Sequence, residues 1–173
     1  SEEKLRILAT PYANEARLKS FLGTDDTEAE MREQLQEGWQ KMADQYCDSD
    51  GVNVLLSHLF MMAKGGTQPE EPEDERSILH IGGAQAVYTE NIPEQIQYTA
   101  LGHLHRHHFV GDKARNVVYS GSLLSYSFSE ANQQKYVVIV DAKPNEPVKT
   151  EKIELKAGKK LFRVRFEETS AAL

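Results

Sequence analysis

The sequence lacks the features that would mark a secreted or membrane-embedded protein. It contains one cysteine, Cys47, which cannot form a disulfide within the chain, and this is typical of a reducing, cytoplasmic environment. No segment approaches the roughly 18 to 20 consecutive apolar residues that a membrane-spanning helix needs. The first residues do not show the charged region followed by an apolar core that defines a signal peptide. We therefore expect a cytoplasmic protein without a membrane partner.

An excess of basic residues is also missing. The chain has 20 Lys and Arg residues against 27 Asp and Glu residues, which gives a formal net charge of −7. Domains that hold nucleic acids by overall electrostatic attraction are usually strongly basic, so this charge argues against that mode of binding. It does not exclude a nuclease, because bound divalent cations and a local basic patch can supply positive charge.

The size and composition fit one folded unit. The 173 residues, of which 39% are hydrophobic, are enough for a single domain with a packed core, and the sequence shows no internal repeat or low-complexity segment. The chain starts at Ser1 without a methionine and runs almost directly into an apolar segment. An excised fragment or a processed chain would begin in this way.

Hydrophobic periodicity predicts an α/β domain with a strand-rich second part. An amphipathic helix is expected from Thr27 to Tyr46, with cap candidates at 24–27 and an apolar stripe of Met31, Leu35, Trp39 and Met42. Short apolar or alternating segments between turn signals predict strands at Leu5–Ala9, Val52–Leu56, Gln97–Leu101, Asn116–Ser120, Lys135–Asp141, Val148–Leu155 and Leu161–Glu167. Ile78–Val87 is expected to be a broken strand, and Gly65–Arg76 has the composition of a loop.

The histidines gather at the ends of two predicted strands. His58 follows one strand, and the other is followed by His103, His105, His107 and His108. In a strand, residues two apart project to the same face about 6 to 7 Å apart, whereas on a helix they would diverge by roughly 200°. His103 and His105 could therefore converge on one metal ion or on two adjacent ions. Gly102 before them lets the backbone leave the strand without strain and lets a ligand approach closely.

The residue types alone leave the kind of site open. Neutral imidazole suits Zn, Fe, Mn and similar cations near pH 7, so three histidines could form a zinc site. A mononuclear catalytic site usually has tighter ligand spacing, however, and a dinuclear hydrolytic site needs a bridging carboxylate, for which no local residue stands out. Surface histidines and hydrogen-bonded core histidines also show this spacing. His80, His107 and His108 are not expected to be ligands.

Four motifs occur in order along the chain, namely Leu55-Leu56-Ser57-His58-Leu59-Phe60, Tyr98-Thr99-Ala100-Leu101-Gly102-His103-Leu104-His105-Arg106, Tyr119-Ser120-Gly121-Ser122-Leu123-Leu124 and Ser127-Phe128-Ser129-Glu130. Together they resemble the signature of the SbcD family, the bacterial branch of the calcineurin-like metallophosphoesterases that serve double-strand-break repair. Between the first two motifs lie a loop ending in Glu75-Arg76 and the pair Gly82-Gly83. The similarity is close from Ser57 to Asp141 and looser from Pro11 to Phe166.

The resemblance implies a fold and a set of metal ligands. The fold is a two-sheet sandwich of mixed sheets flanked by helices. His58 and His103 would bind one metal and His105 the other in a two-metal phosphodiesterase centre. Mn²⁺ is the family's usual activator, with Mg²⁺ or another divalent cation possible. The segment Tyr119–Leu124 would be supporting structure, and Arg106 would either contact a phosphate of the substrate or simply face solvent.

Several parts of the family pattern do not occur in the chain. The motifs Asp-x-His, Gly-Asp-x-x-Asp and Gly-Asn-His-Asp or -Glu are missing, and they would supply the remaining ligands, the bridging aspartate and the histidine that assists the leaving group. The DNA-recognition region that caps the nuclease core is also missing or reduced. The resemblance thus implies that 1–173 is a single domain, the C-terminal portion of a calcineurin-like phosphoesterase domain. It would contain no catalytic residue besides metal ligands and would be inactive alone.

The function implied by the resemblance is that of a DNA exonuclease and endonuclease subunit in repair and recombination. Its partners would be DNA, an SbcC-type ABC ATPase and a second copy of the full-length protein. A small-nucleotide phosphodiesterase or phosphatase of the same superfamily is one alternative, and a non-catalytic interaction module is another. The basic residues Lys159, Lys160, Arg163 and Arg165 could touch DNA or a partner, although basic residues at a sheet edge more often only discourage aggregation.

Overall fold

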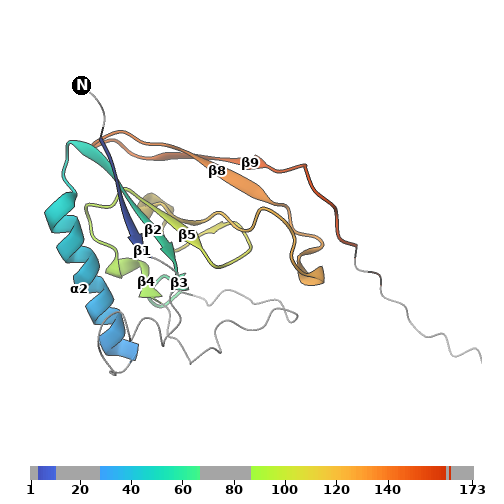
Figure 1. Ribbon diagram of the computed structural model, residues 1–173, viewed down its shortest axis with the longest axis horizontal. Helices are drawn as coiled ribbons and strands as arrows, with labels where there is room; N and C mark the ends of the chain where they lie inside the picture. Colours follow the sequence, from blue (N-terminus) through green and yellow to red (C-terminus); the bar gives the residue numbers. More distant parts are fainter. Residues whose placement is uncertain (1–3, 11–27, 67–86, 163, 165–173) are drawn as a thin grey trace, which may run out of the picture.

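The computed structural model of the chain describes residues 4–10, 28–66, 87–162 and 164. It shows an α/β fold in which strands dominate the second part, as predicted (Figure 1). The strands are β1 (Lys4–Thr10), β2 (Gly51–His58), β3 (Met61–Met62), β4 (Val87–Tyr88), β5 (Tyr98–Gly102), β6 (His108–Phe109), β7 (Val117–Tyr119), β8 (Tyr136–Asp141) and β9 (Lys149–Glu154). The helix α2 spans Glu28–Tyr46, and short 3₁₀ helices lie at Thr89–Asn91 (η2), Lys113–Arg115 (η3) and Phe128–Glu130 (η4).

The main sheet is mixed and has the order β1-β2-β5-β7-β6. Strands β1, β2, β5 and β7 run parallel, and β6 pairs antiparallel with β7. Because the carboxyl ends of parallel strands meet at one edge of a sheet, the residues that follow β2 and β5 lie next to each other. The smaller pairs are β3 with β4, which is parallel, and the antiparallel hairpin of β8 and β9.

Helix α2 covers one face of this sheet. Its buried residues recur at four-residue steps, namely Leu35, Trp39, Ala43 and, just past its end, Cys47. They belong to one core cluster with Leu8, Leu55 and Leu101 of the neighbouring strands. The predicted stripe is wrong at Met42, which is 45% exposed. A repeat of four residues drifts slowly around the helix, so the position three residues after Trp39 turns towards solvent.

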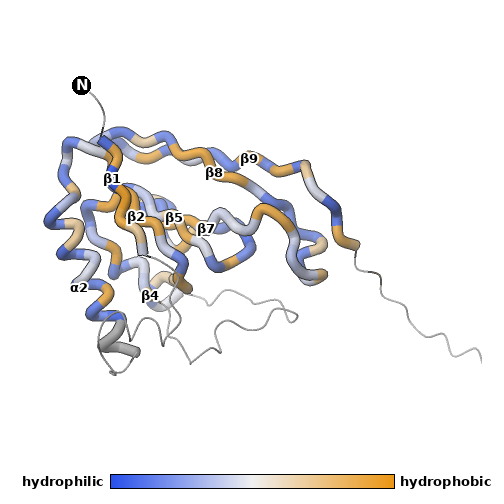
Figure 2. The backbone as a smooth tube through the Cα atoms, viewed as in Figure 1, coloured by the Kyte–Doolittle hydropathy of each residue, from blue (hydrophilic) through white to orange (hydrophobic). Residues whose placement is uncertain are grey.

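The opposite face of the sheet is covered only in part. Side chains alternate between the two faces of a strand. Since Leu8 and Leu55 face the helix, Leu5, Ile7 and Leu56 point the other way, where Leu5 and Ile7 are 63% and 55% exposed. The strand register places Leu56 level with Ala100 and Val118, and Val118 is buried. Figure 2 shows the apolar character of β1 and β2. Strands β1 and β2 thus expose apolar side chains on this face, whereas Val118 of β7 is buried there.

The hairpin of β8 and β9 runs above this face and is fixed at both ends (Figure 1). At its turn, Gln97 Nε2 donates hydrogen bonds to the carbonyl oxygens of Lys143 (2.9 Å) and Glu146 (3.3 Å). At the other end, the ring of Tyr136 lies 5.6 Å from that of His107. The hairpin turns at Pro144-Asn145, where Asn145 has a positive φ of 59°.

Some predicted elements differ or cannot be compared. The strand expected at Leu161–Glu167 is wrong at Leu161, Phe162 and Val164, which are irregular, and its other positions lie outside the described residues. So do most of Gly65–Arg76, most of Ile78–Val87 and the helix cap candidates at 24–27. Val87 opens β4. Within the described part of the chain, no helix has the length and apolar character needed to cross a membrane.

Candidate metal centre

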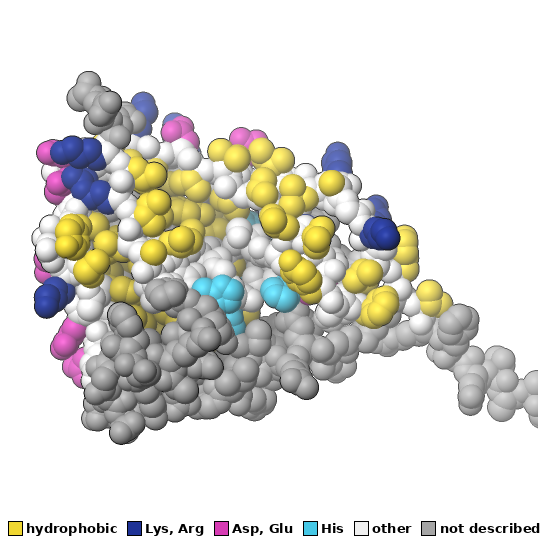
Figure 3. All heavy atoms as spheres, in the orientation of Figure 1, with side chains coloured by type: hydrophobic (Ala, Val, Ile, Leu, Met, Phe, Trp, Pro, Cys, Tyr) yellow, Lys and Arg dark blue, Asp and Glu magenta, His cyan; other side chains and the backbone are white. Residues whose placement is uncertain are grey.

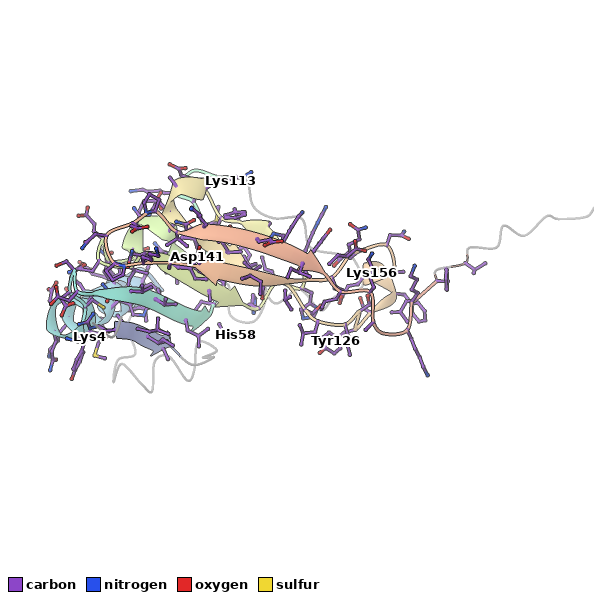
Figure 4. All side chains as sticks on the ribbon, turned by 90° about the horizontal axis from the view of Figure 1, so that it is seen from above. Lys4, His58, Lys113, Tyr126, Asp141 and Lys156 are labelled. Atoms are coloured by element: carbon purple, nitrogen blue, oxygen red, sulfur yellow. The ribbon has the colours of Figure 1, made fainter. Side chains whose placement is uncertain are left out.

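Two of the predicted ligands meet at the carboxyl edge of the main sheet. His58 is the last residue of β2 and pairs in register with Gly102, the last residue of β5. His103 follows directly, and its ring centroid lies 5.5 Å from that of His58, with the rings at 84° to each other. Figure 4 shows His58 at the end of the sheet far from Lys4, on the side of the loop that carries Tyr126. The parallel pairing of β2 and β5 therefore brings these imidazoles together.

Gly102 is needed for this arrangement. A Cβ atom at this position would lie 2.7 Å from Nδ1 of His58, closer than real Cβ contacts come. The His58 ring therefore occupies the space that any side chain at residue 102 would need. The sequence pattern indicates that this glycine allows a close approach, and the structure identifies the approaching group.

The strand geometry predicted for His103-x-His105 is wrong. Strand β5 ends at Gly102, and His103 has a φ of 108°, a conformation that residues with side chains seldom adopt. The two rings are therefore not placed by the alternation of a strand. His103 turns out of the strand towards His58 and Phe60, whose ring centroid lies 6.4 Å away. Such backbone strain persists where the surroundings hold it, and it gathers at functional sites.

His105 is held by a buried carboxylate. Nδ1 of His105 lies 2.9 Å from Oε1 of Glu130, whose side chain is fully buried, whereas that of His105 is 34% exposed. A carboxylate accepts hydrogen bonds, so Nδ1 carries the proton and donates it. Nε2 then carries the lone pair, as a metal ligand requires. The ring of Tyr126 lies 5.5 Å from the His105 ring.

Glu130 has an ion-pair partner of its own. Oε2 of Glu130 accepts a hydrogen bond from Nζ of Lys135, which is also buried, and a second from Oγ of Ser122 at 3.3 Å. Burial alone would raise the pKa of the Glu130 carboxyl. Together, the hydrogen bonds from Lys135 and His105 and the positive charge of Lys135 outweigh that effect and lower this pKa. Glu130 is therefore charged at neutral pH.

The protonation of His58 also suits metal binding. Burial lowers the pKa of its imidazole below the ordinary 6.5, and the nearby His105 lowers it further. The neutral ring, which is the form that binds metals, is therefore favoured at His58. On the face of the molecule seen in Figure 3, histidine side chains lie at the surface, close to exposed hydrophobic side chains.

Comparison with known proteins supports the resemblance that these motifs carry. The chain is 36% identical over 166 residues to the SbcD subunit of the nuclease SbcCD from Bacillus subtilis, an alignment that covers 93% of this chain and 40% of that protein. The resemblance to the SbcD family is confirmed. The chain thus spans about two fifths of the length of this SbcD relative. No protein-family model matches the chain.

The candidate site is incomplete within the described residues. In that part of the chain, no three His, Cys, Asp or Glu side chains are close enough together to hold a metal ion. His58, His103 and His105 fit a divalent cation by the chemistry of their donors and by the Nδ1 anchoring of His105, but they would need further ligands.

The other polar residues near the site, Arg106, His107 and His108, make contacts of their own. Arg106 is exposed, and its carbonyl oxygen accepts a hydrogen bond from Nδ1 of His108 at 3.0 Å. Nδ1 of His107 donates to the carbonyl oxygen of Tyr119 at 3.0 Å, and the His108 ring stacks on the Tyr119 ring. His107 and His108 thus have structural partners. His80 lies outside the described residues.

Tyr119 supports the segment that follows His58. Its buried hydroxyl donates to the carbonyl oxygen of Leu59 and accepts from the backbone N–H of Met61, both at 2.7 Å. Burial raises the pKa of this hydroxyl, so it stays protonated. Sequence reasoning missed the roles of Glu130 and Lys135. The only signal available was the acidic residue that ends the motif Ser127-Phe128-Ser129-Glu130.

Proposed function

We propose that this chain is the C-terminal portion of the nuclease domain of an SbcD-like subunit, which hydrolyses phosphodiester bonds of DNA in repair and recombination. The observation that carries the proposal is the contact between His58 and His103 at the ends of neighbouring strands, with ring centroids 5.5 Å apart. His105 follows two residues after His103, and its Nδ1 is anchored by Glu130. The name of the Bacillus subtilis relative supports the nuclease assignment.

In the proposed centre, His58 and His103 would hold one divalent cation and His105 would hold the second. When bound, two such cations would supply Lewis-acid chemistry at the scissile phosphate and would lower the pKa of a bound water. Mn²⁺ is the expected ion, with Mg²⁺ as the alternative. The chain itself orients the imidazoles, through Gly102 for His58 and through Glu130 for His105. Arg106, exposed next to the ligands, is proposed to contact a phosphate of the DNA.

Two observations support the view that the chain works as part of a longer polypeptide. The described residues lack a group of three ligands, and Leu5, Ile7 and Leu56 leave an apolar sheet face open. A second sheet packed on that face would bury these side chains, as in the two-sheet sandwich of the family. We accordingly propose that residues 1–173 alone do not hydrolyse DNA. An SbcC-type ABC ATPase, a second copy of the full-length protein and a cytoplasmic location belong to the same proposal.

The test is hydrolysis of linear DNA by the full-length protein with Mn²⁺. We expect activity in the full-length protein, none in the isolated chain, and a loss of more than about 100-fold in His103→Ala, since a direct ligand should matter more than its outer partners. His107→Gln is the control, because His107 contacts only structural groups in the described part of the chain, and it should retain activity. A clear Mn²⁺-dependent rate from the isolated chain, abolished by His103→Ala, would contradict the proposed inactivity.

Two other functions make different predictions for the same protein. A small-nucleotide phosphodiesterase or phosphatase would act faster on nucleotides than on DNA, so the ratio of the two rates separates it from a nuclease. A non-catalytic module would bind no pair of Mn²⁺ ions in a calorimetric titration. The proximity of His58 to His103 favours the two metal-dependent functions over the module.

A further inference from the structure

Glu130 occupies an unusual place for a charged residue. It ends the 3₁₀ helix η4, outside the sheet, and its side chain is fully buried. One oxygen, Oε1, accepts a hydrogen bond from Nδ1 of the partly exposed His105, and the other, Oε2, contacts Lys135 and Ser122. Both oxygens are therefore used, each towards a different group.

We infer that Glu130 is a positioning residue for metal binding: its carboxylate fixes the proton of His105 on Nδ1 and thereby directs Nε2 to the cation. This inference rests on the proposed function and deepens it. A carboxylate behind a ligating imidazole sets the ring orientation and increases the basicity of the coordinating nitrogen. The separation of 2.9 Å between Nδ1 and Oε1 is that of a well-formed hydrogen bond to a charged acceptor.

Lys135 and Ser122 hold both the carboxylate and the backbone of the ligand. Nζ of Lys135 contacts Glu130, lies 2.8 Å from Oγ of Ser122 and donates to the carbonyl oxygen of His105 at 3.2 Å. The backbone N–H of Ser122 donates to the same carbonyl oxygen at 3.1 Å. His105 is thus gripped at its ring and at its backbone by one connected group of residues. That grip limits the rotation of the ring.

Stability alone does not account for this arrangement. A buried ion pair contributes little net stability, because the loss of solvation offsets the attraction, and hydrophobic replacements of similar volume are often neutral. A pair that served only the core would also have no need to direct an oxygen to a partly exposed ring. The contact with His105 is therefore the feature that a functional role explains.

The test measures Mn²⁺ binding and the His105 tautomer in the full-length protein. Glu130→Leu combined with Lys135→Met removes both buried charges together, which should preserve the fold. We expect its melting temperature to stay near that of the wild type and its affinity for one of two Mn²⁺ ions to fall about 10- to 100-fold. Long-range ¹H–¹⁵N spectra of labelled histidine should show Nδ1–H at His105 in the metal-free wild type and a mixture of tautomers in the variant.

Controls separate the possible outcomes. Glu151→Gln, which removes an exposed carboxylate on β9, should leave both readouts unchanged. Unchanged Mn²⁺ affinity and tautomer in the folded double variant would overturn the inference while leaving the proposed function intact, provided that His105→Ala still loses an ion. If the wild-type protein binds no Mn²⁺, both the inference and the proposed function fail.

Discussion

At the scale of single residues, the candidate centre depends on the room left for the ligand side chains as much as on the ligands themselves. Gly102 is the clearest case, because the His58 ring fills the volume next to its Cα. Gly38, in the middle of α2, has open space where a Cβ atom would lie, with no neighbouring atom within 4 Å of that position. The two glycines thus allow the effect of the same substitution to be compared at a crowded position and at an open one.

Gly102→Ala should displace the His58 ring and weaken Mn²⁺ binding by the full-length protein at least about 10-fold, the lower range for a disturbed ligand. Gly38→Ala should instead raise the free energy of unfolding by about 1 kcal/mol, because alanine favours helix more than glycine does. Calorimetric titration with Mn²⁺ and denaturant unfolding measure the two effects. Equal Mn²⁺ affinity in Gly102→Ala and wild type would show that the close contact has no bearing on binding.

Tyr119 is a second residue whose contacts set the surroundings of His58. Tyr119→Phe removes the hydroxyl that joins Leu59 to Met61 and leaves a buried carbonyl oxygen and N–H without that partner. We expect a loss of about 1 to 3 kcal/mol in the free energy of unfolding. Tyr126→Phe is the matched control, since Tyr126 is exposed, and it should change stability by less than about 0.5 kcal/mol. Similar unfolding curves for both variants would contradict the role given to Tyr119.

His108 gives the fold a predictable dependence on pH. Burial lowers the pKa of its imidazole below 6.5, and the charges of His107 and Arg106 add to this, while the hydrogen bond to the Arg106 carbonyl oxygen opposes it. The unfolded chain therefore binds a proton more readily than the folded chain. Stability from neutral His108 is present above about pH 6.5 and is lost as the pH falls through the lowered value.

His108→Phe keeps a ring against Tyr119 and removes the titrating group. Its free energy of unfolding should fall less steeply than that of the wild type between about pH 7 and pH 5. Denaturant unfolding at several pH values measures the two slopes. Parallel slopes would show that protonation of His108 does not oppose folding.

At the scale of elements, hydrophobic periodicity predicts those helices and strands that form because one face, or a continuous apolar run, is buried. The helix and the longer strands agree with the sequence pattern to within a few residues, because each buries one face or a continuous apolar run. The two-residue strands β3 and β6 carry too few residues for a pattern. The contact between Glu130 and His105 joins residues 25 positions apart and depends on the path of the connecting loop, which no local signal encodes.

Helix α2 allows the corrected stripe to be tested. Leu35→Ala should lower the free energy of unfolding by about 2 to 5 kcal/mol, because Leu35 is buried in the core between helix and sheet. Met42→Ala, at a position that the sequence pattern assigned to the same stripe, should change it by less than about 0.5 kcal/mol. Denaturant unfolding of both variants decides the matter. A large effect at Met42 would support the stripe expected from the sequence.

At the scale of the whole molecule, a substitution on the exposed apolar face of β1 and β2 should affect the isolated chain and the proposed longer protein differently. Ile7 lies on that face and is 55% exposed. In the isolated chain, Ile7→Lys places a charge in water and should leave the melting temperature nearly unchanged. In the full-length protein, the same charge would be buried without a partner, which costs several kcal/mol, so the melting temperature should fall by several degrees. Equal responses of the two proteins would mean that no second sheet covers this face.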